Sequence, residues 1–240
     1  MKLEFKDLTQ TKLWLSESER QAIIHIIKIS FSNITPEAYL AKYFDSSDAF
    51  ERRLRLYFDQ GNLVGYCLLT FSDESTMIVI RASAGFIPQY RKGDHTFVFS
   101  LSESFKCWLR RPWKKIYYAD TMLSPAMYRA IAKNTGIIWP HPHHPAPEKV
   151  FDLFNSDGDL SSAEPLRCLV SVNRSSNYSA TELTSFATSD KLEIQYYRKL
   201  NPDFNSGVAL FVIIPIHFKQ FLKTALKNAL YLIRGITNEG

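Results

Sequence analysis

The sequence predicts an α/β (α+β) fold, with a mixed and mostly antiparallel sheet that is flanked by helices and followed by a C-terminal extension. Three periodic stretches support this prediction. Apolar side chains recur at helical spacing over residues 16–29. Residues 50–82 change to the alternating period of strands, broken by two short turns. From residue 96 the helical spacing returns.

Composition places the chain among globular proteins. Of its 240 residues, 45% are hydrophobic and 22% are charged, which is enough to bury a full core. The formal net charge of +5 suits an anionic ligand, but the basic residues are spread out and form no nucleic-acid-binding motif. We therefore consider a nucleic-acid partner unlikely. The three cysteines have neither disulfide nor metal spacing, so no metal is expected.

The first half of the chain begins with a helix that Ser16 or Ser18 can cap. Thr35 and Pro36 open a second, shorter helix, because proline is favoured in a first turn. The turn at residues 60–62 joins two strand-like runs, and a second turn leads to a third, which predicts an antiparallel meander. These three strands are expected over residues 50–59, 63–71 and 76–82.

The second half alternates helix and strand around a proline-rich joint. Pro112 ends the helix that starts at residue 96. Residues 139–149 hold several prolines and histidines and are expected to form a linker loop. Other expected strands cover residues 115–120, 166–172 and 208–214, and other expected helices cover 124–136, 181–200 and 216–233.

The segment between the third strand and the helix at residue 96 reads Phe-Ile-Pro-Gln-Tyr-Arg-Lys-Gly-Asp, residues 86–94. It resembles the acyl-CoA pyrophosphate loop of the GNAT superfamily of N-acetyltransferases, in which a loop of this type joins a splayed strand to a helix. The order of elements over residues 16–138 is also similar to that family. The sequence departs from the family spacing, because its single glycine, Gly93, comes one position early and is followed by Asp94.

The resemblance implies a GNAT-like, acyl-CoA-binding core over residues 1–138. Residues 150–240 would complete the sheet or form a second GNAT-like subdomain. The N–H groups at a helix N-terminus bind anions, so the loop would hold the diphosphate of acetyl-CoA or a longer acyl-CoA. The residues expected to do so are Ile87, Arg91, Lys92, Gly93, Asp94, His95 and Thr96.

The activity that the resemblance implies is acyl-CoA-dependent N-acyl transfer, moving an acetyl or longer acyl group from a thioester donor to an unknown amine acceptor. Such a reaction needs a base for the amine and a proton for the leaving thiolate. In the family a tyrosine on the helix after the next strand often supplies that proton, which makes Tyr128 the candidate here. The sequence leaves three candidates for the base: Glu103, Asp120 and a water molecule.

A second hypothesis is a catalytically inactive GNAT-like protein that binds a partner or a membrane surface. Residues 216–234 would form a cationic amphipathic helix, whose apolar stripe either docks in this way or packs on the core. We expect a cytoplasmic protein, because residues 1–10 lack the apolar core of a signal peptide and no window holds about 20 apolar residues. The oligomeric state stays open.

Overall fold

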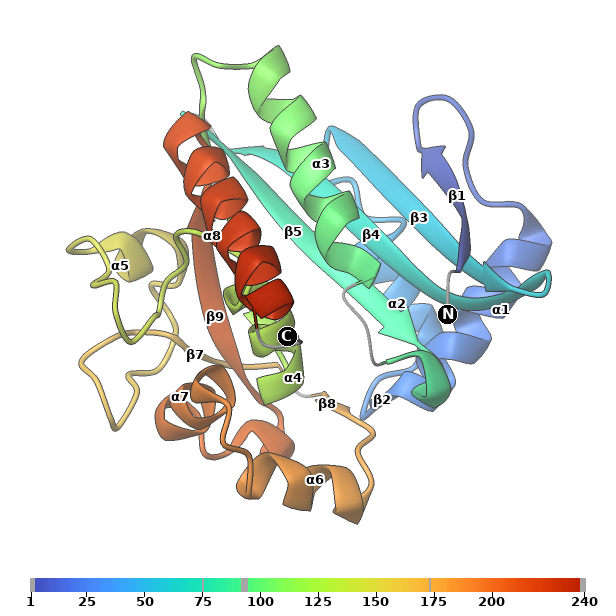
Figure 1. Ribbon diagram of the computed structural model, residues 1–240. Coiled ribbons are helices and arrows are strands. Elements are labelled where there is room, and N and C mark those ends of the chain that lie inside the picture. The colour runs from blue at the N-terminus through green and yellow to red at the C-terminus, as the bar shows by residue number, and fades with distance from the viewer. Residues whose placement is uncertain (1–2, 75, 92–94, 173, 238–240) are drawn as a thin grey trace.

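A computed structural model describes residues 3–74, 76–91, 95–172 and 174–237, and only the backbone of residues 95 and 230–237. Within this part of the chain, seven strands form one sheet in the order β1-β3-β4-β5-β6-β9-β7 (Figure 1). Neighbouring strands are antiparallel except β5 and β6, so the predicted mixed, mostly antiparallel sheet is confirmed. The strands are β1 (Glu4–Thr9), β3 (Glu51–Asp59), β4 (Asn62–Glu74), β5 (Met77–Phe86), β6 (Lys115–Met122), β7 (Leu169–Ser171) and β9 (Val208–Pro215).

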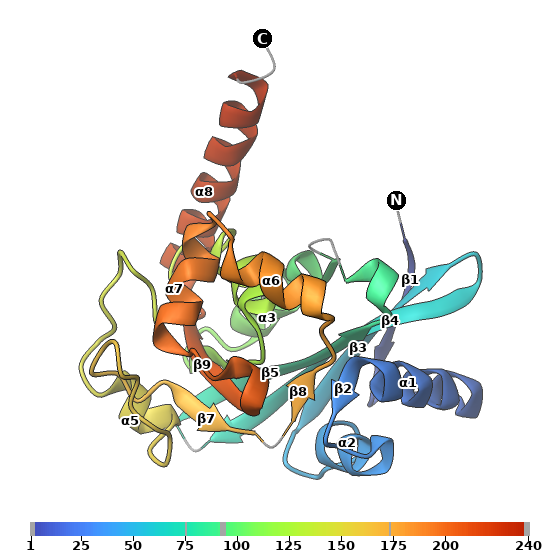
Figure 2. The ribbon, with the colours of Figure 1, turned by 90° about the horizontal axis from the view of Figure 1, so that it is seen from below.

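Helices cover both faces of this sheet. Helices α1 and α2 lie on one face, and α3 and α8 lie on the other (Figure 2). Two short strands, β2 (Phe31–Ser32) and β8 (Ser175–Ser176), pair separately. The helices are α1 (Glu17–Ser30), α2 (Pro36–Tyr43), α3 (His95–Arg110), α4 (Pro125–Ala132), α5 (Val150–Phe154), α6 (Ala180–Ala187), α7 (Leu192–Leu200) and α8 (Phe218–Thr237).

Strand β4 shows how the core has two sides. Its alternate residues Tyr66 and Leu68 pack with α1 and α2, whereas Cys67 and Leu69 pack on the side of α3. Because successive side chains of a strand point to opposite faces, a strand buried on both faces needs apolar residues at nearly every position. This explains the unbroken apolar run that marks β4 in the sequence.

Strand β5 continues to Phe86, four residues beyond its predicted end at residue 82. These added residues pair with β4, from Ser83 opposite Leu68 to Phe86 opposite Gly65. Their small side chains resemble a loop in sequence, but the close packing against β4 requires them. A Cβ atom at position 85 would lie 2.9 Å from the Tyr66 ring.

Two other differences have local causes. Strand β1 was not predicted, because as an edge strand it is mostly exposed and polar; its Asp7 binds Arg55 of β3 at 2.7 Å. The helix expected over residues 181–200 is two helices, α6 and α7. A capping box of Ser179 and Glu182 starts α6.

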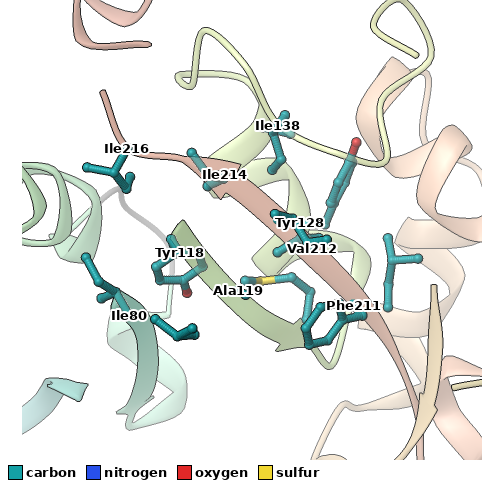
Figure 3. Close-up of a cluster of buried hydrophobic side chains, with 14 of the residues drawn as sticks. Ile80, Tyr118, Ala119, Tyr128, Ile138, Phe211, Val212, Ile214 and Ile216 are labelled. Atoms are coloured by element: carbon teal, nitrogen blue, oxygen red, sulfur yellow. The ribbon is translucent and has the colours of Figure 1, made fainter. Parts of the chain in front are cut away.

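The C-terminal residues extend the same sheet. Strand β9 pairs with β6 from Pro215 opposite Tyr117 to Leu210 opposite Met122, and β7 pairs with the outer edge of β9. Figure 3 shows the core that results, where Tyr118 and Ala119 of β6 lie beside Val212 of β9. The predicted linker loop at 139–149 starts along β9, since the backbones of Trp139 and Ile213 exchange hydrogen bonds of 2.9 and 2.8 Å.

Helix α8 is attached to the body by polar residues. Gly136 N–H donates to Thr224 Oγ1 at 3.0 Å, and Gln220 Nε2 donates to the Ile137 carbonyl at 3.0 Å. Lys227 Nζ and Asn228 Nδ2 donate to carbonyl oxygens of residues 132–135, which follow the last turn of α4. Of the apolar residues of this helix, Phe221 packs against the core, whereas Phe218, Leu222 and Leu226 are exposed.

The histidines of the 139–149 loop form no metal site with their neighbours in the described part of the chain. Among the described residues, no three histidine, cysteine, aspartate or glutamate side chains gather as metal ligands. The rings of His141 and His144 stack at 4.6 Å in the 139–149 loop, and burial lowers the pKa of His141 from 6.5 to about 4. No helix in the described ranges combines the length and apolar character needed to cross a membrane.

Opposite faces of α8 are expected to respond differently to substitution. Thr224→Val leaves the Gly136 N–H without its acceptor and should lower the free energy of unfolding by about 1–3 kcal/mol. Leu222→Ala, on the exposed face, should change it by less than about 0.5 kcal/mol. Urea unfolding measures both. A loss of about 2–5 kcal/mol for Leu222→Ala would instead mean that this face is part of the core.

Candidate functional site

The parallel strands β5 and β6 separate partway along their length. They pair only from Met77 opposite Lys115 to Ile80 opposite Tyr118. Beyond this point β5 stays paired with β4, and β6 stays paired with β9. The sheet is therefore split between residues 81–86 of β5 and residues 119–122 of β6.

The Asp120 carboxylate lies at the point where the split begins. Its Oδ2 accepts a hydrogen bond from Ala82 N–H on β5, and its Oδ1 accepts one from Thr121 N–H, both at 2.7 Å. A side chain thus takes the place of the backbone bond that would continue the strand pair. Burial raises the pKa of Asp120, although these two N–H groups and the charges of Arg174 and Arg81 act in the opposite direction.

A cavity of about 340 Å³ occupies the split and the space above it. Its walls come from β5, β6, α3, α4, α6 and the first turn of α8. Polar side chains also line it, and Asp120 and Tyr178 are among them. Most of the lining is apolar, with Phe97, Leu101, Met127, Ile131, Phe186 and Phe221 among its side chains.

The edge of β5 faces this cavity with its backbone. Ala82 directs its N–H toward Asp120, and in a strand the backbone groups alternate sides with a period of two. Ala84 therefore directs its N–H and C=O to the same side, where β6 no longer lies opposite. Both alanines line the cavity. An extended ligand with amide groups can pair with such an edge as an added strand does.

Helix α3 begins at the other end of the cavity. Its backbone starts at His95, and Thr96 of its first turn lines the cavity. The first N–H groups of a helix have no partner within the helix, so they favour an anion. Three residues predicted to bind the diphosphate, Lys92, Gly93 and Asp94, lie outside the described residues, as does the side chain of His95. Their roles stay predictions.

Arg91 lines the cavity and also joins three segments of the chain. Its Nη1 donates to the Asn177 carbonyl at 2.8 Å, and its other nitrogens donate to the carbonyls of Phe86 and Ile29 at 3.4 Å. Its guanidinium lies 5.7 Å from the centre of the Tyr178 ring. Ile87 has a structural position instead, because its N–H donates to the Val64 carbonyl at 3.0 Å and its side chain packs against the core.

Tyr128, the predicted proton donor, lies away from the cavity lining. Its side chain is fully buried on α4 beside the rings of Tyr196 and Tyr197, and its hydroxyl donates to the Pro140 carbonyl at 2.9 Å. Burial raises its pKa well above the usual value. The role as donor stays a prediction that this placement does not support.

Of the candidate bases, only Asp120 lines the cavity. Glu103 is buried between Arg53 and Lys106, bonded to Lys106 Nζ at 2.6 Å. Burial acts to raise the pKa of Glu103, but its bonds to these two cations outweigh that effect and lower it. Glu103 therefore serves as an ion-pair partner. The geometry singles out Asp120 where the sequence left both residues open.

The segment around Tyr178 also lines the cavity and was not predicted to do so. The pairing of β8 with β2 brings it there, and the Tyr178 hydroxyl is hydrogen-bonded to Ser124 Oγ at 2.8 Å. Its neighbour Glu182 follows on α6 and lines the same wall. The capping box of α6 can be recognised in the sequence, but the pairing of β8 with β2 cannot, because it joins residues more than 140 positions apart.

Cys67 lines the cavity and carries a thiol, a group that can act as a covalent nucleophile. Burial raises the pKa of its thiol to about 12. At neutral pH it is therefore protonated, and a thiol reacts far more slowly than a thiolate. Cys67 is therefore a poor nucleophile at neutral pH.

No protein-family model and no curated protein sequence matches the chain. Solved structures with a similar arrangement include ElaA of Escherichia coli (15% identity, 68% of this chain and 90% of that one, TM-score 0.35). Another is the ribosomal-protein-S18-alanine N-acetyltransferase of Escherichia coli (8% identity, 89% of this chain and 96% of that one, TM-score 0.36). A third is the aminoglycoside 6′-N-acetyltransferase of Enterococcus faecium (10% identity, 90% of this chain and 98% of that one, TM-score 0.38).

The arrangement of this chain's own elements decides the fold. Two helices precede a three-strand meander, a loop and helix α3 follow, and the next strand, β6, is parallel to β5 and then splays from it. The fold is a divergent GNAT-like fold. The resemblance seen in residues 16–138 is therefore confirmed for the fold. A fold alone does not identify a substrate.

Replacement of Asp120 tests its place at the split. Asp120→Asn keeps the shape but loses one of two acceptors, so one backbone N–H is left without its partner. We expect the free energy of unfolding to fall by about 1–3 kcal/mol. The matched control is Asp73→Asn, which removes an exposed ion pair with Lys114 and should cost less than about 1 kcal/mol. Equal values for the two variants in urea unfolding would contradict this role of Asp120.

Proposed function

We propose that this protein is an acyl-CoA-dependent N-acyltransferase, which moves an acetyl or longer acyl group to an amine. The cavity in the split between β5 and β6 carries this proposal. The pantetheine arm of coenzyme A is extended and holds two amide groups. The N–H and C=O of Ala84 are placed to pair with such an arm along the edge of β5.

The diphosphate would then reach the N-terminus of α3. The residues predicted to bind it are Arg91, Lys92, Gly93, Asp94, His95 and Thr96. Of these, Arg91 and Thr96 line the cavity, and Ile87 holds the end of the preceding strand through its bond to Val64. The hydrogen-bond partners described for Arg91 are carbonyl oxygens, which leave its positive charge without a paired carboxylate. That charge, together with the N–H groups at the start of α3, favours the binding of an anion at the opening of the cavity.

In the proposed reaction the amine nitrogen attacks the thioester carbon, the new C–N bond forms and the C–S bond breaks. Asp120 accepts the proton that the amine loses; each oxygen keeps a further lone pair beyond its bond to a backbone N–H. The leaving thiolate takes a proton. Tyr118 and Tyr178 line the cavity, and because burial raises the pKa of both hydroxyls, each holds a proton at neutral pH.

The second candidate function is binding without catalysis. Two observations favour it: Tyr128 lies outside the cavity lining, and Arg91 is held by structural bonds. Turnover of a bound thioester with a panel of amines separates the two candidates. The acceptor and the length of the acyl group stay open, and a cytoplasmic location stays a prediction.

Calorimetric titration with acetyl-CoA and with longer acyl-CoA thioesters tests the cavity directly. We expect binding in the micromolar range, weakened at least about tenfold by Ala130→Trp, because Ala130 lines the cavity and the indole would fill it. Ala187→Trp adds the same ring to an exposed position outside the lining and should leave the affinity unchanged. If no thioester binds the wild type, or if Ala130→Trp binds as well as the wild type, the proposal is wrong.

A further inference from the structure

Helix α8 turns its apolar side to the solvent. The face that contacts the body is formed largely by polar residues, with Gln220 and Thr224 buried. The exposed stripe consists of Phe218, Leu222 and Leu226, whose relative exposures are 63%, 49% and 56%. Residues four apart share one side of a helix. The amphipathic pattern of α8 is therefore inverted with respect to a helix that packs on a core.

Helix α3 adds to this surface. Figure 1 shows α3 and α8 on the same face of the sheet, and the rings of Phe105 and Phe221 meet at 4.7 Å between them. Val98, Phe105 and Leu109 of α3 are exposed. Exposed apolar side chains on adjoining elements indicate an interaction site when they gather. We call this set the α3–α8 ridge, and it consists of Val98, Phe105, Leu109, Phe218, Leu222 and Leu226.

Basic side chains accompany the ridge. Lys219 and Lys223 are exposed on α8, and Lys106 and Arg110 are exposed on α3. Helix α8 contains no acidic residue in its sequence, and the acid of α3, Glu103, is buried and paired with Arg53 and Lys106. The surface therefore combines exposed apolar groups with an excess of positive charge.

We propose that the α3–α8 ridge docks on an anionic lipid surface. Apolar side chains enter the boundary between headgroups and acyl chains, while the lysines lie among the negative headgroups. A second copy of the chain fits less well, because it would bring Lys219 and Lys223 toward the same positive charges. Figure 2 shows α8 rising from the body, so that a flat surface can reach it.

Docking in this way would place the cavity next to the membrane. The inner sides of the same two helices line the cavity, with Phe97 and Leu101 from α3 and Gln220 and Phe221 from α8. The ridge and the cavity are thus two sides of one layer of the protein. The proposal about the ridge does not depend on the proposed acyl transfer, since it rests on the outer side alone.

Co-sedimentation with phosphatidylcholine vesicles, with and without phosphatidylserine, tests the proposal. We expect the full-length wild type to bind the vesicles that contain phosphatidylserine, and high salt to weaken this binding. Leu222→Gln with Leu226→Gln should lower the partition coefficient about tenfold or more, because two apolar groups no longer enter the interface. Lys219→Glu with Lys223→Glu should abolish the preference for phosphatidylserine.

The control is Leu192→Gln on α7, which changes a leucine that is more exposed than Leu222 and Leu226 and lies away from the ridge, and this variant should bind as the wild type does. Circular dichroism checks that each variant is folded. No binding by the folded wild type, or equal binding by the ridge and control variants, would overturn the proposal. Sedimentation velocity tests whether a second copy of the chain binds the ridge instead. If the wild type is a dimer that does not bind vesicles, and the ridge variants are monomers, the ridge is a dimer interface.

Discussion

The separation of β5 from β6 depends on the hydrogen bonds of one carboxylate. Where the backbone of β6 would continue the pair, Asp120 accepts the N–H of Ala82 and leaves Ala84 facing the cavity. Beyond this point β5 continues along β4, and β6 continues along β9. At this point a side-chain oxygen replaces a backbone carbonyl as the acceptor. The cavity and the free backbone edge of β5 begin there, and burial at the same place raises the pKa of Asp120.

The C-terminal third of the chain forms much of the wall around this split. Strand β9 holds the free side of β6, the segment from β8 to α6 brings Tyr178 over one end of the cavity, and α8 closes the other end with Phe221. Residues 150–240 thus build walls for a site whose floor comes from the first 138 residues. Because α8 is attached by polar contacts, its apolar side remains exposed, which links the site to the α3–α8 ridge.

Much of the fold was predictable because it is encoded locally. The N-cap of α1, the turn at residues 60–62 and the apolar run of β4 each act over a few residues, and the structure confirms them. Of the two predicted caps, Ser16 and Ser18, Ser16 is the one used. The site was less predictable. Asp120 and Tyr178 gain their positions from strand separation and from the long-range pairing of β8 with β2, and neither leaves a mark in spacing. Tyr128 has the expected helix but faces a different part of the core.

Amide hydrogen exchange along β5, measured by NMR with and without acyl-CoA, tests the split most directly. Gly85, whose N–H faces β4, is the internal control and should exchange slowly in both states. We expect slow exchange at Ala82, rapid exchange at Ala84 in the free protein, and protection of Ala84 once the thioester is bound. Slow exchange at Ala84 without ligand, or no change when acyl-CoA is added at a concentration that saturates the protein, would contradict this expectation.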